Sequence, residues 1–250
     1  MSLSKSSYYY RPKLKPEDKA IKQYLLMLSK QHKRWGFEKM LQKAKLDKKP
    51  WNHKRLYRVY CELNLNIRIK PRKRLPKGEA RSLMYPITSN ICWSMDFMTD
   101  VLDTGQRFRT LNIIDDFNRE GLAIDIALSQ PTDSVISVLK SVIAKRGKPR
   151  HIRSDNGPEF ISSKFKRWAQ LNDIELLYIQ PGKPAQNGFI ERFNRTYRED
   201  ILDMYLFSSL TEARQITEAW LEKYNIARPH SSLNGLTPEM FKEKYGQLVR

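Results

Sequence analysis

The sequence predicts an α/β protein, with a mixed sheet covered by helices and a small all-α module in front of it. Helical periodicity dominates the first third of the chain, strands and helices alternate after residue 90, and the basic residues are concentrated before that change. Residues 1–90 hold 24 Lys and Arg against 6 Asp and Glu, a net charge of +18, whereas residues 91–250 carry only +1. The charge division indicates two functional parts.

The composition bounds the class of protein. The 250 residues, 40% of them hydrophobic, are enough to build packed cores. No apolar run approaches the ~18 residues of a membrane span, and the first residues contain no signal-peptide core. Cys61 and Cys92 form neither a disulfide framework nor a Cys-x-x-Cys zinc site. We expect a soluble cytoplasmic protein with no membrane partner, whose main partner is a polyanion.

Three short helices are expected after a flexible leader of residues 1–16. The first begins near Pro16, because Glu17 and Asp18 then lie in its first turn, where the helix dipole favours acidic side chains. Apolar residues at helical spacing indicate all three helices. These residues are Ala20, Ile21, Tyr24, Leu25 and Leu28, then Phe37, Met40, Leu41 and Ala44, then Leu56, Val59, Tyr60 and Leu63.

The third helix is the candidate DNA-contacting element. Asn52 is a good N-cap, and Lys54, Arg55 and Arg58 crowd the first turns of the helix. Three helices with a basic third one are what a helix-turn-helix needs, so residues 17–68 are predicted to form such a DNA-binding domain. A solvated basic bundle that enters no groove is the alternative. A membrane surface is disfavoured as partner, because no helix has the bulky apolar face that anchors at an interface.

A basic segment follows this module. Residues 69–88 include Arg72, Lys73 and Arg74 among prolines and a glycine, which is the composition of a linker. The same cations can contact DNA phosphates, so we expect the linker to bind DNA as well.

The remainder of the chain alternates between strand and helix patterns. The strands are predicted over 91–98, 108–117, 121–128, 151–154 and 175–180, and the helices over 132–146, 162–172 and 186–206. This order implies a mixed central sheet with helices on it. We assign residues 89–207 to this core and residues 208–250 to a C-terminal helical extension.

Three carboxylates in the core are candidates for a catalytic and metal-binding site. Asp96 lies within an apolar strand, where a carboxylate is costly unless it is hydrogen-bonded or binds a cation. Asp155 follows a strand at the edge where α/β sheets bind ligands, and Glu191 lies one turn into a helix. Together they can hold two Mg²⁺ or Mn²⁺ ions, an arrangement that supports in-line phosphoryl displacement.

The contexts of these acids match a known pattern. Asp96 stands in W-S-M-D, Asp155 in S-D-N-G-P-E-F and Glu191 in P-x-x-N-G-x-x-E, with 58 and 35 residues between successive acids. The chain thus resembles the retroviral-integrase-like (DDE) transposases of bacterial insertion sequences. Residues 224–238 resemble the C-terminal signature of that family, and the basic start resembles the helix-turn-helix of its second-frame (OrfB) products. The resemblance covers residues 17–245.

The resemblance implies a ribonuclease-H-like core and a DNA transposase or integrase activity. A metal-activated water would expose a 3′-hydroxyl at an element end, and that hydroxyl would attack a target phosphodiester without a covalent enzyme intermediate. The resemblance also implies double-stranded DNA as substrate, a homo-oligomer that bridges two ends, and the upstream-frame (OrfA) product as a further partner. Met98 stands where many relatives have Thr, which leaves Asp96 undisturbed as a ligand. The His and Cys residues lack the spacing of the retroviral zinc module.

Four residues near the predicted site are further candidates for binding DNA. Arg195 and Arg198 follow Glu191 by four and seven positions, on the same helix face. Ordinary pairing with nearby acids is the alternative for both. Lys183 and Asn187 flank the loop before this helix, where they could grip a DNA end.

The other acids of the core are interpreted as structural. Asp115 and Asp116 lie in Asp-Asp-Phe-Asn-Arg, which is typical of a hairpin turn. Asp100 and Asp103 are expected to be turn residues, and Glu159 is expected at a solvated helix N-terminus.

Two other functions stay open. A ribonuclease-H-like nuclease would share the core and the metals but would not need the basic module. A catalytically inactive DNA-binding regulator derived from a transposase would share the module, although the three intact acids argue against it. A tyrosine recombinase is disfavoured, because no His-x-x-Arg occurs and residues 8–10, its candidate tyrosines, lie in the polar leader.

Overall fold

The computed structural model describes residue 9 and residues 16–67, 86–180 and 184–246. The chain divides into two compact units, Met1–Pro71 and Arg72–Arg250, and each has its own hydrophobic core. The predicted leader and linker fall almost wholly outside the described residues. No helix of the described segments is long and apolar enough to span a membrane. Also outside the description lie four predicted DNA-binding residues, Arg72, Lys73, Arg74 and Lys183.

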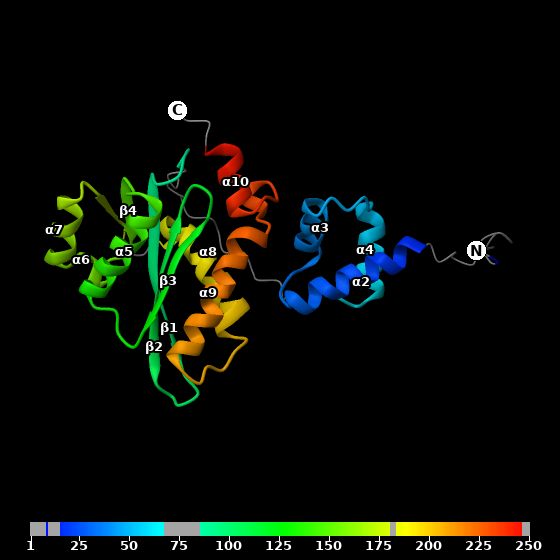
Figure 1. Cartoon of the computed structure of the whole chain (residues 1–250), viewed down its shortest axis with the longest axis horizontal. Coiled ribbons are helices and arrows are strands. Elements are labelled where there is room, and N and C mark those ends of the chain that lie inside the picture. Colours follow the sequence, from blue (N-terminus) through cyan, green and yellow to red (C-terminus); the bar gives the residue numbers. More distant parts are fainter. Residues whose placement is uncertain (1–8, 10–15, 68–85, 181–183, 247–250) are drawn as a thin grey trace. The chain divides into compact units, whose positions relative to one another are not determined.

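The first unit contains the three predicted helices, α2 (Pro16–Gln31), α3 (Phe37–Leu46) and α4 (His53–Glu62) (Figure 1). Asn52 caps α4 as predicted, since its side chain accepts a hydrogen bond from a backbone N–H two residues on, at 2.9 Å. The predicted apolar positions build the core, except Ala20, which is exposed. The buried side chains are Ile21, Tyr24, Leu25, Leu28, Trp35, Met40, Leu41, Ala44, Leu56, Val59 and Tyr60.

The second unit is built on a five-stranded mixed sheet in the order β3-β2-β1-β4-β5. Strand β2 is antiparallel to both of its neighbours, whereas β1, β4 and β5 are parallel to one another. The predicted α/β class is confirmed, since a mixed sheet with helices follows an all-α unit. The strands are β1 (Cys92–Val101), β2 (Arg107–Asp115), β3 (Gly121–Ala127), β4 (His151–Ser154) and β5 (Glu175–Tyr178).

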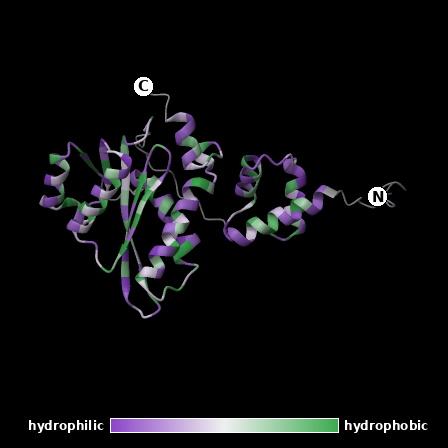
Figure 2. Cartoon of the chain, viewed as in Figure 1, coloured by the Kyte–Doolittle hydropathy of each residue, from purple (hydrophilic) through white to green (hydrophobic). Residues whose placement is uncertain are grey.

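Helices cover both faces of this sheet (Figure 1). One face carries α5, α6 and α7 on a core that includes Trp93, Met95, Leu111 and Ile113. The opposite face carries α8 and α9, which pack on the even-numbered residues of β1 and β2, because strand side chains alternate between faces. The helices carry hydrophobic and hydrophilic residues side by side, as expected for elements that bury one face (Figure 2). Their bounds are α5 Thr132–Arg146, α6 Pro158–Ile161, α7 Ser163–Leu171, α8 Gly188–Tyr197 and α9 Leu210–Ala227.

The C-terminal helices α9 and α10 (Pro238–Tyr245) belong to the same compact unit as the sheet. Helix α9 lies along the edge strand β3, where the Arg214 guanidinium donates twice to the Ile126 carbonyl, at 2.9 and 2.7 Å. The Asn225 amide both donates to and accepts from the backbone of Gly121, each at 2.9 Å. The extension therefore supplies hydrogen bonds that an edge strand otherwise lacks.

The prediction of one long helix over residues 186–206 is wrong in one respect, because the structure divides this segment into three parts. After α8 the hydrogen-bond spacing lengthens, since the backbone N–H of Asp203 donates to the Arg198 carbonyl five residues back, at 2.8 Å. Such π-type turns are rare and occur mainly at functional sites. The three parts are the 3₁₀-helix η1 (Pro184–Asn187), α8, and the π-helix η2 (Arg198–Leu202).

The π-turn follows from the contacts of η2. Its last two residues, Ile201 and Leu202, are both buried in the α8–α9 core. In a regular α-helix, two adjacent residues do not easily face the same core. Its first residue, Arg198, is held by β1, because its guanidinium donates to the Thr99 carbonyl at 2.9 Å. Helical periodicity alone carries no sign of these tertiary contacts.

Candidate active site

The sheet register brings the first two predicted acids to the same level. Strands β1 and β4 are parallel, and Ser94 is paired with Arg153. Asp96 and Asp155 each follow that pair by two residues, so they lie side by side. Asp155 ends its strand in a tight turn, in which the Gly157 N–H donates to Asp155 Oδ1 at 3.0 Å. A Cβ at Gly157 would lie 3.0 Å from the same oxygen, so glycine leaves this carboxylate uncrowded.

Helix α8 supplies the third acid. Ile190, Phe193 and Tyr197 form an apolar stripe on this helix and are buried against the sheet. This anchoring leaves Glu191 exposed in the first turn of α8. The helix packs on β1 and β2, the face of the sheet that carries Asp96.

Asp155 and Glu191 lie close enough to Asp96 to affect its ionisation. The pKa of Asp96 is raised to about 6, mainly by burial and also by the charges of Asp155 and Glu191. The groups that oppose this shift are the Phe97 N–H and the Asn194 amide. Desolvation also raises the pKa of Glu191, while the Arg195 charge lowers it. The charges of Asp155 and Glu191 thus act on Asp96 in the folded chain, and a joint catalytic role of the three acids stays a prediction.

The donor set of this site fits a hard divalent cation, because it consists of carboxylate oxygens alone. Within the described segments, no three acidic, His or Cys side chains lie close enough to enclose a metal ion. Repulsion among ionised carboxylates opposes such closure, and the exposed side chain of Glu191 can change rotamer. The fit therefore rests on the chemistry and mutual proximity of the donors.

Asn194 is a site residue that the sequence prediction missed. Its Nδ2 donates to Asp96 Oδ2 at 2.9 Å, and its Oδ1 accepts from Asn112 Nδ2 at 2.7 Å. Both asparagines are buried. One sequence signal could have identified Asn194, since it follows Glu191 by three positions and so lies on an adjoining part of the helix face.

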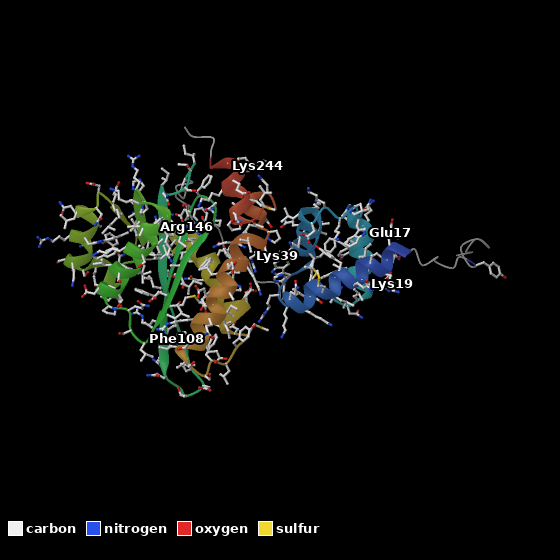
Figure 3. The ribbon with its side chains drawn as sticks, in the orientation of Figure 1. Glu17, Lys19, Lys39, Phe108, Arg146 and Lys244 are labelled. Atoms are coloured by element: carbon white, nitrogen blue, oxygen red, sulfur yellow. The ribbon has the colours of Figure 1, made fainter. Side chains whose placement is uncertain are left out.

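The predicted DNA-binding cations of α4 fall into two groups. Lys54 is exposed. Arg55 instead pairs with Glu17 (labelled in Figure 3) and with Asp18, whose Oδ1 accepts from Arg55 Nε at 2.7 Å. Arg58 donates to the other oxygen of Asp18 at 2.8 Å. The fold thus engages two of the three predicted cations within the helical unit.

The predicted DNA-binding residues in and next to α8 are also divided. Arg195 is exposed beside Glu191. Arg198 is held by β1, through the Thr99 carbonyl and through Asp100 Oδ2 at 3.1 Å. Asn187 is buried at the start of α8. Of these three residues, Arg195 is the one that presents an exposed positive charge beside the site.

The acids interpreted as turn residues are more involved in packing than predicted. Asp115 ends β2 and is buried, with its Oδ2 accepting from the Asn90 N–H at 2.8 Å. Asp116 is fully buried and pairs with Arg153 at 2.7 Å. Asp100 lies within β1 rather than in a turn, whereas Asp103 is an exposed turn residue.

The chain matches models of the integrase core domain over residues 88–184 and again over residues 172–238. It is 36% identical over 245 residues to a 39.2 kDa protein of insertion element IS476 from Xanthomonas euvesicatoria, covering 97% of this chain and 70% of that protein. It is 35% identical to a 31.7 kDa protein of insertion element IS407 from Burkholderia multivorans, covering 98% and 88%.

A further relative carries an activity in its name. The transposase InsD of insertion element IS2 from Escherichia coli is 27% identical over 207 residues, covering 79% of this chain and 68% of that protein. The integrase-core matches include all three acids of the site, Asp96, Asp155 and Glu191. The chain belongs to the integrase-like transposases of bacterial insertion elements.

Proposed function

We propose that this chain catalyses metal-dependent DNA strand cleavage and strand transfer, in which a 3′-hydroxyl attacks a phosphodiester directly. The observation that supports this most is the convergence of Asp96, Asp155 and Glu191 at one edge of an integrase-core sheet. Its relatives are proteins of insertion elements, which fits a role in moving such an element.

The three acids are the proposed ligands of two Mg²⁺ or Mn²⁺ ions. Bound ions would activate the attacking oxygen and stabilise the leaving oxygen of an in-line displacement. Asp96 and Asp155 present their carboxylates from adjacent strands, so the sheet sets their spacing. Glu191 would complete the site from a helix, and its exposed side chain can adjust to the substrate.

The basic residues are proposed to hold double-stranded DNA. Lys54 and Arg195 are exposed, which supports phosphate contacts from the helical unit and from the active site. Arg72, Lys73, Arg74 and Lys183 stay candidates on their charge alone. The contacts of Arg55, Arg58 and Arg198 support a mainly structural contribution instead.

Joining requires two element ends, so we propose that the chain acts as a homo-oligomer on DNA. A helix-turn-helix role for α2–α4 is supported by the three-helix architecture and the open position of Lys54 on α4. The product of an upstream frame stays a proposed partner.

A strand-transfer assay on DNA that carries the terminal repeats of the element tests this proposal. We expect Asp155→Asn to abolish joining while binding of the same DNA, followed by fluorescence anisotropy, stays within about twofold. Asp173→Asn is the matched control, because the Asp173 side chain is 90% exposed and outside the site. Joining that survives Asp155→Asn or needs no divalent metal would contradict the proposal. Cleavage of RNA–DNA hybrids without joining would indicate the ribonuclease-H-like nuclease.

A further inference from the structure

Two buried amides connect Asp96 to the interior of the second unit. Asn112 Nδ2 donates to Asn194 Oδ1 at 2.7 Å, and Asn194 Nδ2 donates to Asp96 Oδ2 at 2.9 Å. Asn112 is 0% exposed and Asn194 is 7% exposed. We propose that this chain of hydrogen bonds, here termed the amide relay, positions Asp96 for metal binding and couples it to the helix that carries Glu191. The inference rests on the proposed metal-dependent function.

The relay joins three elements of the site. Asn112 on β2 lies directly opposite Asp96 on β1, and both belong to the sheet face that packs on α8. Asn194 projects from α8 between them, three residues after Glu191. A change at Asn194 therefore reaches both the strand and the helix that supply metal-binding oxygens.

The relay has one hydrogen-bonding direction. An ionised carboxylate only accepts hydrogen bonds, so Asn194 must turn its NH₂ group toward Asp96. Its oxygen then faces Asn112, which must donate. The hydrogen bond from Asn112 reinforces this orientation of the Asn194 amide, because it satisfies the Asn194 oxygen on the side away from Asp96.

Asn112 lowers the stability of the fold compared with an apolar residue at the same position. Its Oδ1 is buried and accepts no hydrogen bond from the described part of the chain. Burying an unsatisfied amide oxygen is unfavourable, and an apolar side chain of similar volume would avoid the penalty. The hydrogen bond that Asn112 does make goes to Asn194, so we assign the amide to orientation rather than to stability.

The relay holds one oxygen of Asp96 while the backbone holds the other. The Phe97 N–H donates to Asp96 Oδ1 at 2.8 Å, and Asn194 donates to Oδ2. The plane of the carboxylate is then set before any ligand arrives, while each oxygen keeps lone-pair capacity for a cation. Partners that orient a ligand in this way typically contribute about ten- to hundredfold to metal affinity.

Mn²⁺ binding to the full chain, followed by electron paramagnetic resonance of the free ion, tests the relay without relying on activity. We expect Asn194→Leu to weaken Mn²⁺ binding about ten- to hundredfold and Asn112→Leu to weaken it by a smaller factor. Asn118→Leu is the matched control. Asn118 is also fully buried and donates to the Pro238 carbonyl at 3.1 Å, outside the site, so this variant should bind Mn²⁺ as the wild type does. Wild-type affinity in Asn194→Leu would overturn the relay.

A second measurement decides the case in which a variant does not fold. In the metal-free wild type, the relay predicts slow hydrogen exchange of the Asn194 side-chain amide by NMR, and faster exchange in Asp96→Ala. Fast exchange in the wild type, or equal rates in both proteins, would overturn the relay. A wild type that shows slow exchange but binds no Mn²⁺ would contradict the proposed function and leave the hydrogen-bonded relay standing.

Discussion

Two groups of three acids lie in the second unit and differ in what offsets their charge. The site acids are carried by β1, by the turn after β4 and by α8, and the sheet-end acids lie around the turn from β2 to β3. The backbone N–H of Asp116 donates to the carbonyl of Cys92, four residues before Asp96, so the groups are about 13 Å apart along β1. The site acids are Asp96, Asp155 and Glu191, and the sheet-end acids are Asp115, Asp116 and Glu120.

Two of the sheet-end acids, Asp116 and Glu120, are paired with cations within the fold, whereas Asp115 accepts hydrogen bonds from the backbone N–H groups of Asn90 and Phe117. Arg153 donates to Asp116 at 2.7 Å, and both side chains are buried. Glu120 accepts from Arg146 (labelled in Figure 3) at 2.6 Å and from Lys242 at 3.2 Å. Such pairing offsets the cost of burying charge, so these carboxylates connect the turn to β4, α5 and α10.

In the described part of the chain, Asp96 has no comparable cation partner. The groups that favour ionisation of Asp96 are N–H donors, whereas its neighbours Asp155 and Glu191 oppose it. Bound cations would relieve this repulsion. The comparison teaches that the same residue type on one sheet stabilises the fold where its charge is matched internally, and is available for chemistry where it is not.

The largest expected contrast is between two Asp→Asn substitutions. Asp96→Asn should lower the joining rate on the order of 10²–10³-fold or more, because it removes a charge that faces the reaction. The same change should leave the free energy of unfolding equal or higher at pH 7, because it removes repulsion among the site acids. Urea unfolding and the strand-transfer assay measure the two quantities. A loss of stability in Asp96→Asn would contradict the comparison.

Arg153→Met tests the other half of the comparison. It would leave the Asp116 carboxylate buried without its partner, so the free energy of unfolding should fall by about 3–5 kcal/mol. Arg107→Met, at an exposed position of β2, should change it by no more than about 0.5 kcal/mol. Adding Asp116→Asn to Arg153→Met should recover part of the loss. Equal stabilities of Arg153→Met and Arg107→Met would show that the pair of Asp116 and Arg153 does not stabilise the fold.

The pH dependence of stability should separate Asp115 from ordinary surface acids. Burial raises the pKa of Asp115 from 3.8 to about 6, so the folded chain keeps a proton that the unfolded chain has lost between these values. The contribution of Asp115 to stability is therefore full below about pH 4 and decreases as the pH rises through 6, by up to about 3 kcal/mol.

Urea unfolding at pH 4.5, 5.5 and 6.5 checks this expectation. Asp115→Asn should flatten the decline in the free energy of unfolding, whereas Asp173→Asn should leave it unchanged, since Asp173 is an exposed acid. An identical slope in the wild type and Asp115→Asn would show that Asp115 titrates normally.

The smallest expected effect extends the comparison to cations. Lys54→Gln should reduce the salt dependence of DNA binding by about one phosphate contact, because Lys54 is exposed on α4. Arg55→Gln should instead lower the stability of the first unit by about 1–2 kcal/mol, because Arg55 pairs with the buried Asp18. Anisotropy titrations at several salt concentrations and thermal unfolding distinguish the two variants. A salt slope altered by Arg55→Gln but not by Lys54→Gln would reverse the assignment.

The sequence predicted most of the fold because its local signals agreed with the final packing. The helical stripes of α2–α4 became the core of the first unit, and the five predicted strands form the mixed sheet. The family prediction is confirmed by relatives that span nearly the whole chain. The prediction of one helix over 186–206 was wrong, because the π-turn depends on the contact of Arg198 with β1 and on the burial of Ile201 and Leu202.

The sequence by itself determined which acids are candidates for chemistry, since motif and spacing distinguish Asp96, Asp155 and Glu191 from other acids. Only the tertiary structure decided which charged side chains are paired with a partner inside the fold. Arg55 and Asp18 are 37 positions apart, and Asn194 and Asp96 are 98 positions apart. Pairing over such separations depends on how helices and strands pack, and local periodicity and motif spacing do not specify that packing.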